Sequence, residues 1–286
     1  MDDGLTEQFE RKRDHLRAVA YRMLGSAAEA DDAVQEAWLR LNRSDVDGVD
    51  NLGGWLTTVV GRICLDMLRS RKARGEDSLD AHVPDPIVTL ESDADPEAEA
   101  VLADSVGLAL LVVLDTLAPA ERLAFVLHDM FGVPFDEIAP ILGRSVAASK
   151  QLASRGRRRV RGAAPAPDAD VVRQRRIVDA FLAAAREGDF EALVTLLDPE
   201  VVLRADTGTA GSQVVRGAGS VVRQALRFSR LASTGRRVLV NGVPGLISVR
   251  EGGRVGAVLA FSIVNGRITQ LDILADPERL VGVGMA

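Results

Sequence analysis

The chain has 286 residues, is 47% hydrophobic and has a formal net charge of -6, which suits two or three domains with cores of their own. Its single cysteine, Cys64, excludes an intrachain disulfide, and its three histidines lie too far apart in the sequence for a zinc site, so we expect no metal and no cofactor. The longest apolar run, Val106–Leu114, is too short to cross a bilayer and the N-terminus lacks the apolar segment of a signal peptide, so we expect a cytoplasmic protein without membrane association.

Helical periodicity runs through the first part of the chain. The segment from Thr6 to Leu41 predicts helices that are interrupted at Gly25-Ser26. The helix after this break combines an apolar seam, which includes Trp38 and Leu41, with an acidic face. The residues of that face are Asp31, Asp32 and Glu36. Such a face is either a docking surface or an ordinary solvated surface.

A further helix is predicted over Trp55–Lys72. Its polar face holds Arg62, Asp66 and Arg69. The cations that gather at its C-terminal end are Arg69, Arg71, Lys72 and Arg74. Cations in this position suit the helix dipole as well as DNA phosphates, so a structural role and a DNA-binding role are both open.

The next segment is acidic. No Lys or Arg occurs from Gly75 through Glu121, and the part up to Glu99 contains three prolines with little periodicity, which is typical of an extended linker. Its acids either keep the linker soluble or occupy the neighbouring basic clusters when DNA is absent. Because salt screens charges beyond about 8–10 Å, the net negative charge of the chain does not exclude local DNA binding.

Residues 133–162 carry a helix-turn-helix pattern, preceded by two helices predicted over Glu99–Leu117 and Ala120–Phe131. Gly143 breaks the apolar repeat, and Ser145 stands where the second helix needs an N-cap. The basic residues of that second helix are Lys150, Arg155, Arg157, Arg158, Arg159 and Arg161. A cationic second helix is the usual means of reading a major groove, and the alternative is a helical hairpin with a solvated basic face.

After a proline-rich segment at residues 163–168, the pattern becomes α+β. The predicted helices cover residues 170–187, 190–197 and 219–231, and the predicted strands cover residues 201–205, 236–241, 245–250, 256–264 and 267–274. Asn265-Gly266, between the last two strands, predicts a two-residue hairpin turn. We therefore predict helices laid on a curved antiparallel sheet.

These segments together resemble the extracytoplasmic-function (ECF) sigma factors of the sigma-70 family. Glu29–Leu41 resembles region 2.2, Asn51–Arg74 resembles regions 2.3 and 2.4, and Leu114–Val160 resembles region 4. The resemblance implies two all-α domains that bind RNA polymerase core enzyme and promoter DNA and catalyse no reaction. It places region 2 at residues 1–75, an acidic linker at 76–104 and region 4 with its helix-turn-helix at 105–163.

The same resemblance implies three sets of binding residues. The core polymerase would bind Asp31, Asp32, Glu36, Trp38 and Leu41. The promoter -10 element would bind Arg62, Asp66, Arg69, Arg71 and Lys72. The promoter -35 element would bind Ser145, Lys150, Gln151, Ser154, Arg155, Arg157 and Arg158.

Residues 164–286 resemble a SnoaL-like domain of the nuclear-transport-factor-2-like superfamily, an α+β cone that one subgroup of these sigma factors carries as a C-terminal extension. The resemblance implies that this domain regulates the protein by intramolecular contact. The contact residues would be Val83, Pro84, Asp85 and Pro86 of the linker, and Asp276, Pro277 and Leu280 near the C-terminus. Arg204, Asp206 and Asp272 either converge in a pocket for a small-molecule ligand or form structural ion pairs, and we favour the ion pairs.

Two other functions remain open from the sequence. One is a ligand-sensing helix-turn-helix regulator that acts without polymerase. The other is a small-molecule enzyme of the SnoaL-like type fused to a DNA-binding module.

Overall fold

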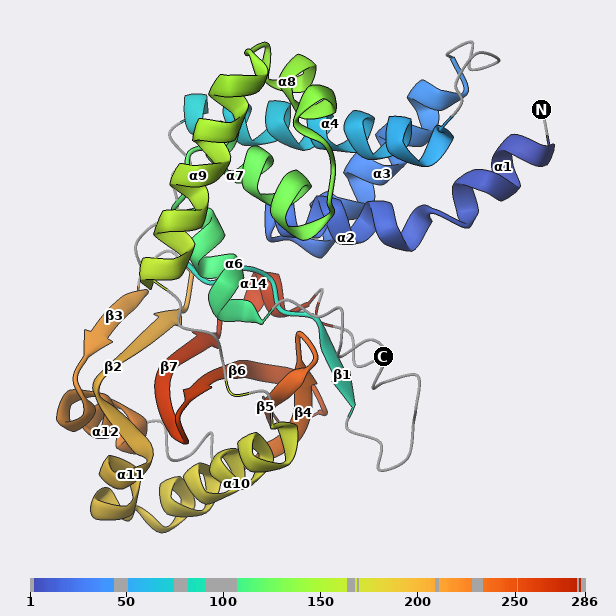
Figure 1. Cartoon of the computed structure of the whole chain (residues 1–286). Coiled ribbons are helices and arrows are strands. Elements are labelled where there is room, and N and C mark those ends of the chain that lie inside the picture. The colour runs from blue at the N-terminus through green and yellow to red at the C-terminus, as the bar shows by residue number, and fades with distance from the viewer. Residues whose placement is uncertain are drawn as a thin grey trace. The chain divides into compact units, whose positions relative to one another are not determined.

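The computed structural model describes residues 3–43, 51–74, 82–90, 107–163, 168, 170–208, 211–227, 234–250, 252–281 and 283 (Figure 1). Most of the predicted acidic linker and of the proline-rich segment after region 4 lies outside these ranges. The chain divides into two compact units, Met1–Asp77 with Val113–Ala163, and Ser78–Val112 with Ala164–Ala286. The described residues contain no helix that is both long and apolar enough to cross a membrane.

The first unit begins with a helical domain of α1–α4. These helices are α1 (Asp3–Glu10), α2 (Arg13–Leu24), α3 (Ala27–Leu41) and α4 (Leu52–Arg74). Gly25 ends α2 in the left-handed conformation, at φ 72°, and the side chain of Ser26 caps α3 by accepting from the amide of Glu29. Apolar stripes of α2, α3 and α4 form the core, with Leu16, Met23 and Leu56 fully buried.

A second helical domain follows. Its helices are α6 (Leu108–Asp115), α7 (Pro119–Phe125), the π-helical turn η1 (Val126–Met130), α8 (Phe135–Leu142) and α9 (Val146–Ala163). It belongs to the first unit from Val113 onward, and the earlier part of α6 belongs to the second unit. Pro119 begins α7, and the predicted helix over Ala120–Phe131 is divided into α7 and η1. Gly143, at φ 62°, ends α8, and Ser145 caps α9 through a bond from the Ala148 amide to its Oγ, 3.2 Å. The helix-turn-helix prediction is confirmed.

The two helical domains pack against each other within the first unit. α4 approaches the second helical domain closely at Gly61, where an added Cβ would lie 3.1 Å from the side-chain end of Leu127 and 3.4 Å from that of Leu123. The buried guanidinium of Arg122 forms an ion pair with Asp115 and donates to the carbonyl oxygen of Arg22, 3.2 Å. The buried faces of both domains therefore form one continuous interior.

The second unit is built on a seven-stranded sheet in the order β1-β4-β5-β6-β7-β2-β3. The strands are β1 (Val88–Leu90), β2 (Leu197–Asp206), β3 (Gln213–Arg216), β4 (Gly235–Val240), β5 (Val243–Val249), β6 (Val255–Val264) and β7 (Arg267–Leu274). Asn265 and Gly266 turn between β6 and β7 with positive φ, as the sequence predicts. All neighbours are antiparallel except β2 and β7, which pair in parallel.

Helices cover one face of this sheet in Figure 1. They are α10 (Val171–Glu187), α11 (Phe190–Leu196) and α12 (Ala218–Arg227), while α14 (Pro277–Leu280) follows the last strand. The core between helices and sheet includes Phe181, Leu193 and Phe261. Two helical domains followed by an α+β domain with a curved sheet were predicted, and this fold class is confirmed. The short strands β1 and β3 were not predicted.

Candidate functional site

The acidic face of α3 lies on the surface of the first helical domain. Asp31 and Asp32 are exposed, and Asp31 forms an ion pair with Arg17 at 2.7 Å. Glu36 is half-buried and pairs with Arg40 one turn later, at 2.9 Å. Trp38 packs on Phe9 with ring centroids 4.9 Å apart, and Leu41 is buried, so both stabilise the helix from its inner side. The part of this face that a partner can reach is therefore acidic.

The basic end of α4 contains side chains in different states. Arg69 and Lys72 are exposed, and Arg69 lies 3.7 Å from Asp66, a weak surface pair. Arg71 is different, because it forms an ion pair with Glu29 and donates to the carbonyl oxygen of Leu24. Arg71 therefore ties α4 to the α2–α3 turn, whereas Arg69 and Lys72 extend into solvent.

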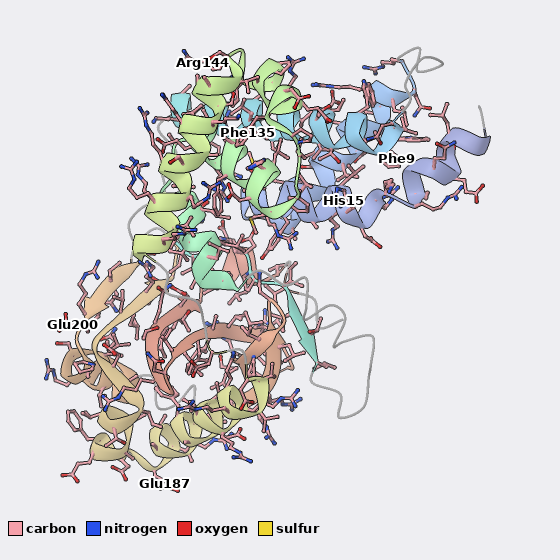
Figure 2. All side chains as sticks on the ribbon, in the orientation of Figure 1. Phe9, His15, Phe135, Arg144, Glu187 and Glu200 are labelled. Atoms are coloured by element: carbon pink, nitrogen blue, oxygen red, sulfur yellow. The ribbon has the colours of Figure 1, made fainter. Side chains whose placement is uncertain are left out.

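The basic helix α9 presents one face to solvent. Lys150, Gln151, Ser154, Arg155 and Arg158 are exposed, and Figure 2 shows nitrogen-tipped side chains projecting from the outer side of this helix. Arg157 is partly buried and pairs with Asp129 of η1, so it also fixes the helix to the domain. Ser149 is fully buried and donates its hydroxyl to the Ser145 carbonyl oxygen, 3.0 Å, which satisfies a polar group inside the helix-turn-helix.

The inner face of α9 packs closely against α7. A Cβ at Gly156 would lie 3.0 Å from the Cβ of Phe125 and 3.3 Å from the carbonyl oxygen of Glu121, both on α7. Arg159 pairs with the Glu121 carboxylate at 2.8 Å. The exposed face of α9 is thus positioned by contacts along its opposite side.

In the second unit, residues 82–90 of the linker lie against the C-terminal domain. Strand β1 pairs with β4, so the linker forms the edge of the sheet. Ile87 and Asn241 exchange two hydrogen bonds, of 3.0 Å and 2.7 Å. Pro84 and Pro86 are buried, as is Val83. The two prolines lie outside β1, where their missing N–H groups cost no sheet hydrogen bond.

Asp206, at the end of β2, is the centre of the polar contacts to the linker. Its carboxylate accepts from the amide of Val83 at 3.1 Å, from the amide of Gly208 at 3.2 Å and from Arg279 at 2.7 Å. Burial by itself raises the pKa of Asp206, but hydrogen bonds from His82 and these amides, with the charge of Arg279, hold it well below the usual range. The carboxylate is therefore ionised when the linker is bound.

Arg279 of α14 completes this arrangement. Its guanidinium donates to Asp85 at 2.8 Å, to Asp206 and to the carbonyl oxygen of Val83. Asp276 caps α14 by accepting from the Glu278 amide, which orients the helix that carries Arg279. The sequence indicated the segment that contains Arg279 but did not select this residue. The signal that could have selected it is that Arg279 is the one basic residue of this segment, while the linker contact residues include an acid, Asp85.

Asn241 was also missed by the sequence analysis. It lies in the β4–β5 turn with φ 50°, a conformation that Asn adopts more readily than most residues. Its pairing with Ile87 depends on strand β1, which the sequence did not predict.

Arg204 and Asp272 are neighbours in register on β2 and β7, with Nη1 and Oδ1 3.5 Å apart. Asp272 is fully buried, which raises its pKa to about 6 despite the opposing effects of Arg204 and of Gln270, whose amide donates to it at 2.7 Å. Asp206 lies on the same strand as Arg204 but bonds to the linker. The sequence left these three residues open as a pocket or as structural ion pairs, with the ion pairs favoured, and in the structure they form two separate groups.

Comparison with known families agrees with this geometry. Sigma-70 region 2 matches residues 8–74, and Sigma-70 region 4 matches residues 107–160. The first helical domain is therefore a sigma region 2 and the second is a sigma region 4, which defines the class as a sigma-70-type transcription initiation factor.

The relatives identify the family. The chain is 40% identical to the ECF RNA polymerase sigma factor SigJ of Mycobacterium tuberculosis over 292 residues, covering 96% of this chain and 93% of SigJ. It is 36% identical to the probable ECF RNA polymerase sigma factor SigI of the same organism, covering 97% and 95%. The SigJ crystal structure matches with a TM-score of 0.79 at 36% identity and covers 98% of this chain and all of that one. The chain belongs to the ECF RNA polymerase sigma factors.

Family membership establishes the general function. The protein directs promoter-specific initiation by RNA polymerase and is not an enzyme. Sigma factors bind the polymerase core and promoter DNA, so the helix-turn-helix belongs to a polymerase subunit and not to an independent repressor. The prediction of a sigma factor is confirmed, and the two alternative functions are not needed.

Proposed function

We propose that the exposed carboxylates of α3 bind the polymerase core, that α4 contacts the -10 element and that α9 contacts the -35 element, in the cytoplasm. The support for the first role is that Asp31 and Asp32 are exposed on a rigid helix. Arg69 and Lys72 supply phosphate contacts, which are independent of sequence and sensitive to salt. Gln151 and Arg155 follow the N-cap of α9 at exposed positions, and their side chains suit adenine and guanine.

The C-terminal domain regulates this activity by binding the linker that connects the two promoter-binding domains in the sequence. The observation that carries this proposal is the placement of Arg279, which joins α14 to Asp85 and Asp206 at once. Residues 82–90 are the part of the linker that this contact fixes, so the contact limits how far region 2 and region 4 can separate. Arg204 and Asp272 pair with each other inside the sheet, separately from this contact.

The proposal is tested by transcription in vitro with core polymerase and a cognate promoter. Wild-type protein is compared with Arg279→Ala, which releases the linker, and with Asp31→Ala/Asp32→Ala, which removes the acidic face. We expect the Arg279 variant to bind core polymerase normally but to give a changed amount of transcript. We expect the α3 variant to lose core binding. Unchanged transcription by the Arg279 variant would show that the linker contact is only structural.

A further inference from the structure

Asp168, between α9 and α10, is bonded to the C-terminal domain by both its main chain and its side chain. Its carboxylate accepts from the amides of Asn265 and Gly266, at 2.8 Å each, and its own amide donates to the carbonyl oxygen of Ile263 at 2.8 Å. The side-chain amide of Gln174, a buried residue of α10, donates to the Asp168 carbonyl oxygen. These hydrogen bonds fix the chain to the β6–β7 turn a few residues after α9 ends.

The β6–β7 turn is suited to bind a carboxylate. Asn265 and Gly266 both have positive φ, 52° and 77°, and the amides of both residues point to the same Asp168 side chain. Successive amides of a turn form a concave site for an anion, and hydrogen bonds to an ionised group are about twice as strong as neutral ones. The turn therefore binds the connecting segment in addition to joining two strands.

The position of Asp168 limits the reach of α9 from the C-terminal domain, whatever the arrangement of the two units. Ala163 ends α9, and five Cα–Cα steps lead from it to Asp168, a distance of at most about 18 Å. Without the bonds of Asp168, the next fixed element is α10, whose first residue, Val171, lies eight steps from Ala163 and at most about 29 Å away. Asp168 thus shortens the maximum reach by about 11 Å.

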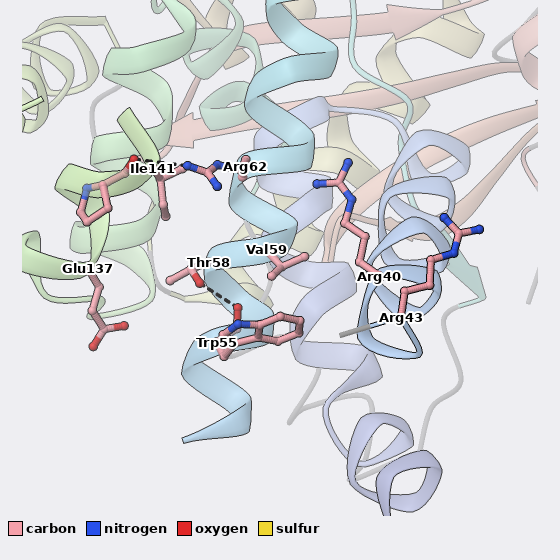
Figure 3. Close-up of a pocket in the computed structure, with 9 residues that line it drawn as sticks. Arg40, Arg43, Trp55, Thr58, Val59, Arg62, Glu137 and Ile141 are labelled. Atoms are coloured by element: carbon pink, nitrogen blue, oxygen red, sulfur yellow. Dashed lines mark hydrogen bonds between the residues drawn. The ribbon is translucent and has the colours of Figure 1, made fainter. Parts of the chain in front are cut away.

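Reach matters because the packed contact between the two helical domains is not compatible with binding both promoter elements. Arg62 of α4 faces α8 and donates to the carbonyl oxygen of Pro140 over 3.4 Å (Figure 3). The -10 and -35 elements are about 25 base pairs apart, which is about 85 Å of duplex. The two domains must therefore separate on a promoter, and the segments that connect them then limit how far apart they can lie.

We propose that Asp168 is a specificity-determining residue, which limits the lengths of spacer between the -10 and -35 elements that the protein accepts. The inference rests on the proposed function, because α4 and α9 must bind the two elements while residues 82–90 remain on the C-terminal domain. Residues 82–90 then fix the chain after region 2, and Asp168 fixes it after region 4. Each added base pair lengthens the spacer by about 3.4 Å, so the reach of about 11 Å that Asp168 removes corresponds to about three base pairs.

The test is transcription in vitro with core polymerase on promoters whose spacer is lengthened or shortened by up to about four base pairs. Asp168→Pro removes the carboxylate and the amide donor together, and insertion of Gly-Ser-Gly after Ala164 gives the same longer reach while Asp168 stays in place. We expect both variants to keep the transcript from the best spacer within about twofold of the wild type, and to reduce the loss caused by about two added base pairs by at least about threefold. The same insertion after Gly252, in the exposed β5–β6 turn, is the control and should leave the spacer preference unchanged.

Hydrogen exchange on the full chain shows separately whether Asp168 binds the turn. The amides of Asn265 and Gly266 should exchange at least about tenfold faster in Asp168→Pro and at the wild-type rate in the insertion after Ala164. The inference is overturned if the spacer preference is unchanged in both variants or changes in only one of them, since reach would then not be what selects the spacer. A wild-type protein whose transcription does not depend on the -35 element would instead overturn the proposed function.

Discussion

Replacing Arg279 with alanine should release the linker from the C-terminal domain. The Arg279 side chain is 23% exposed, Asp85 is 29% exposed and Asp206 only 8%, so these charges are screened less than a surface pair. Charge-assisted hydrogen bonds contribute about 1.5–3 kcal/mol each and are not additive, and losing one partner of a buried pair costs about 3–5 kcal/mol. Because these side chains are partly exposed, we take the lower end of this range and expect the free energy of releasing the linker to decrease by about 3 kcal/mol.

Hydrogen exchange measures this effect directly. A change of about 3 kcal/mol corresponds to a roughly hundredfold rise in the population that exposes the amides of Val83 and Ile87. Arg223→Ala, at an exposed arginine of α12, is the matched control and should leave their exchange rates unchanged. If exchange at Val83 and Ile87 is the same in Arg279→Ala and the wild type, sheet pairing of β1 alone holds the linker and our reasoning is wrong.

Three shorter predictions follow from other sites. Gly156→Ala should destabilise the second helical domain by about 1–3 kcal/mol in urea unfolding because of its contact with α7, whereas Gly162→Ala in the same helix, with nothing within 4 Å of its added Cβ, should not destabilise it. Ser145→Ala should cost about 1 kcal/mol by loss of the N-cap, and Ser145→Asp should restore stability while weakening duplex binding by charge repulsion. The pKa of Asp272 is raised in the folded state to about 6. The free energy of unfolding should therefore fall by about 3 kcal/mol as the pH rises from about 4 to 6, and it should then stay level. In Asp272→Asn, the urea midpoint should not show this decrease across the same pH range.

Local signals predicted most of the helices and strands. The left-handed Gly143 and the cap at Ser145 are written in adjacent residues, and the Asn265-Gly266 turn is equally local. Strand β1 was missed because it has three residues next to prolines and pairs with β4, which lies about 150 residues further along the chain. Such a short strand forms because it can pair with the edge of β4. The residues of β1 alone contain no periodicity that predicts this pairing.

In the candidate site, the sequence could also predict what depends on neighbouring residues but not what depends on residues far along the chain. Exposed positions on α9 follow from helical spacing after a recognisable cap, so the sequence could indicate them. Arg71 and Arg157 look like their neighbours in the sequence, but their ion pairs with Glu29 and Asp129 make them structural in part. Their partners lie more than 25 residues away, and which of several adjacent cations turns inward is decided by packing of the folded domain.

The contact between the two helical domains gives a final prediction. Gly61 meets the side-chain ends of Leu123 and Leu127, which are flexible, so Gly61→Ala should be tolerated and should gain helix propensity of up to about 1 kcal/mol. Gly61→Leu adds more volume than these side chains can yield and should push the second helical domain away from α4. Because Arg62 then loses the Pro140 carbonyl oxygen, its guanidinium becomes available to DNA.

Small-angle scattering and duplex binding at low salt separate the outcomes. In Gly61→Leu we expect a larger radius of gyration and tighter binding to a -10 duplex, with Gly61→Ala matching the wild type in both measurements. An expanded protein with unchanged DNA affinity would mean that packing of the helical domains does not restrain the promoter-binding surface of α4. A protein that remains compact would mean that Leu123 and Leu127 can move aside, so that the close approach at Gly61 is not what sets the distance between the domains.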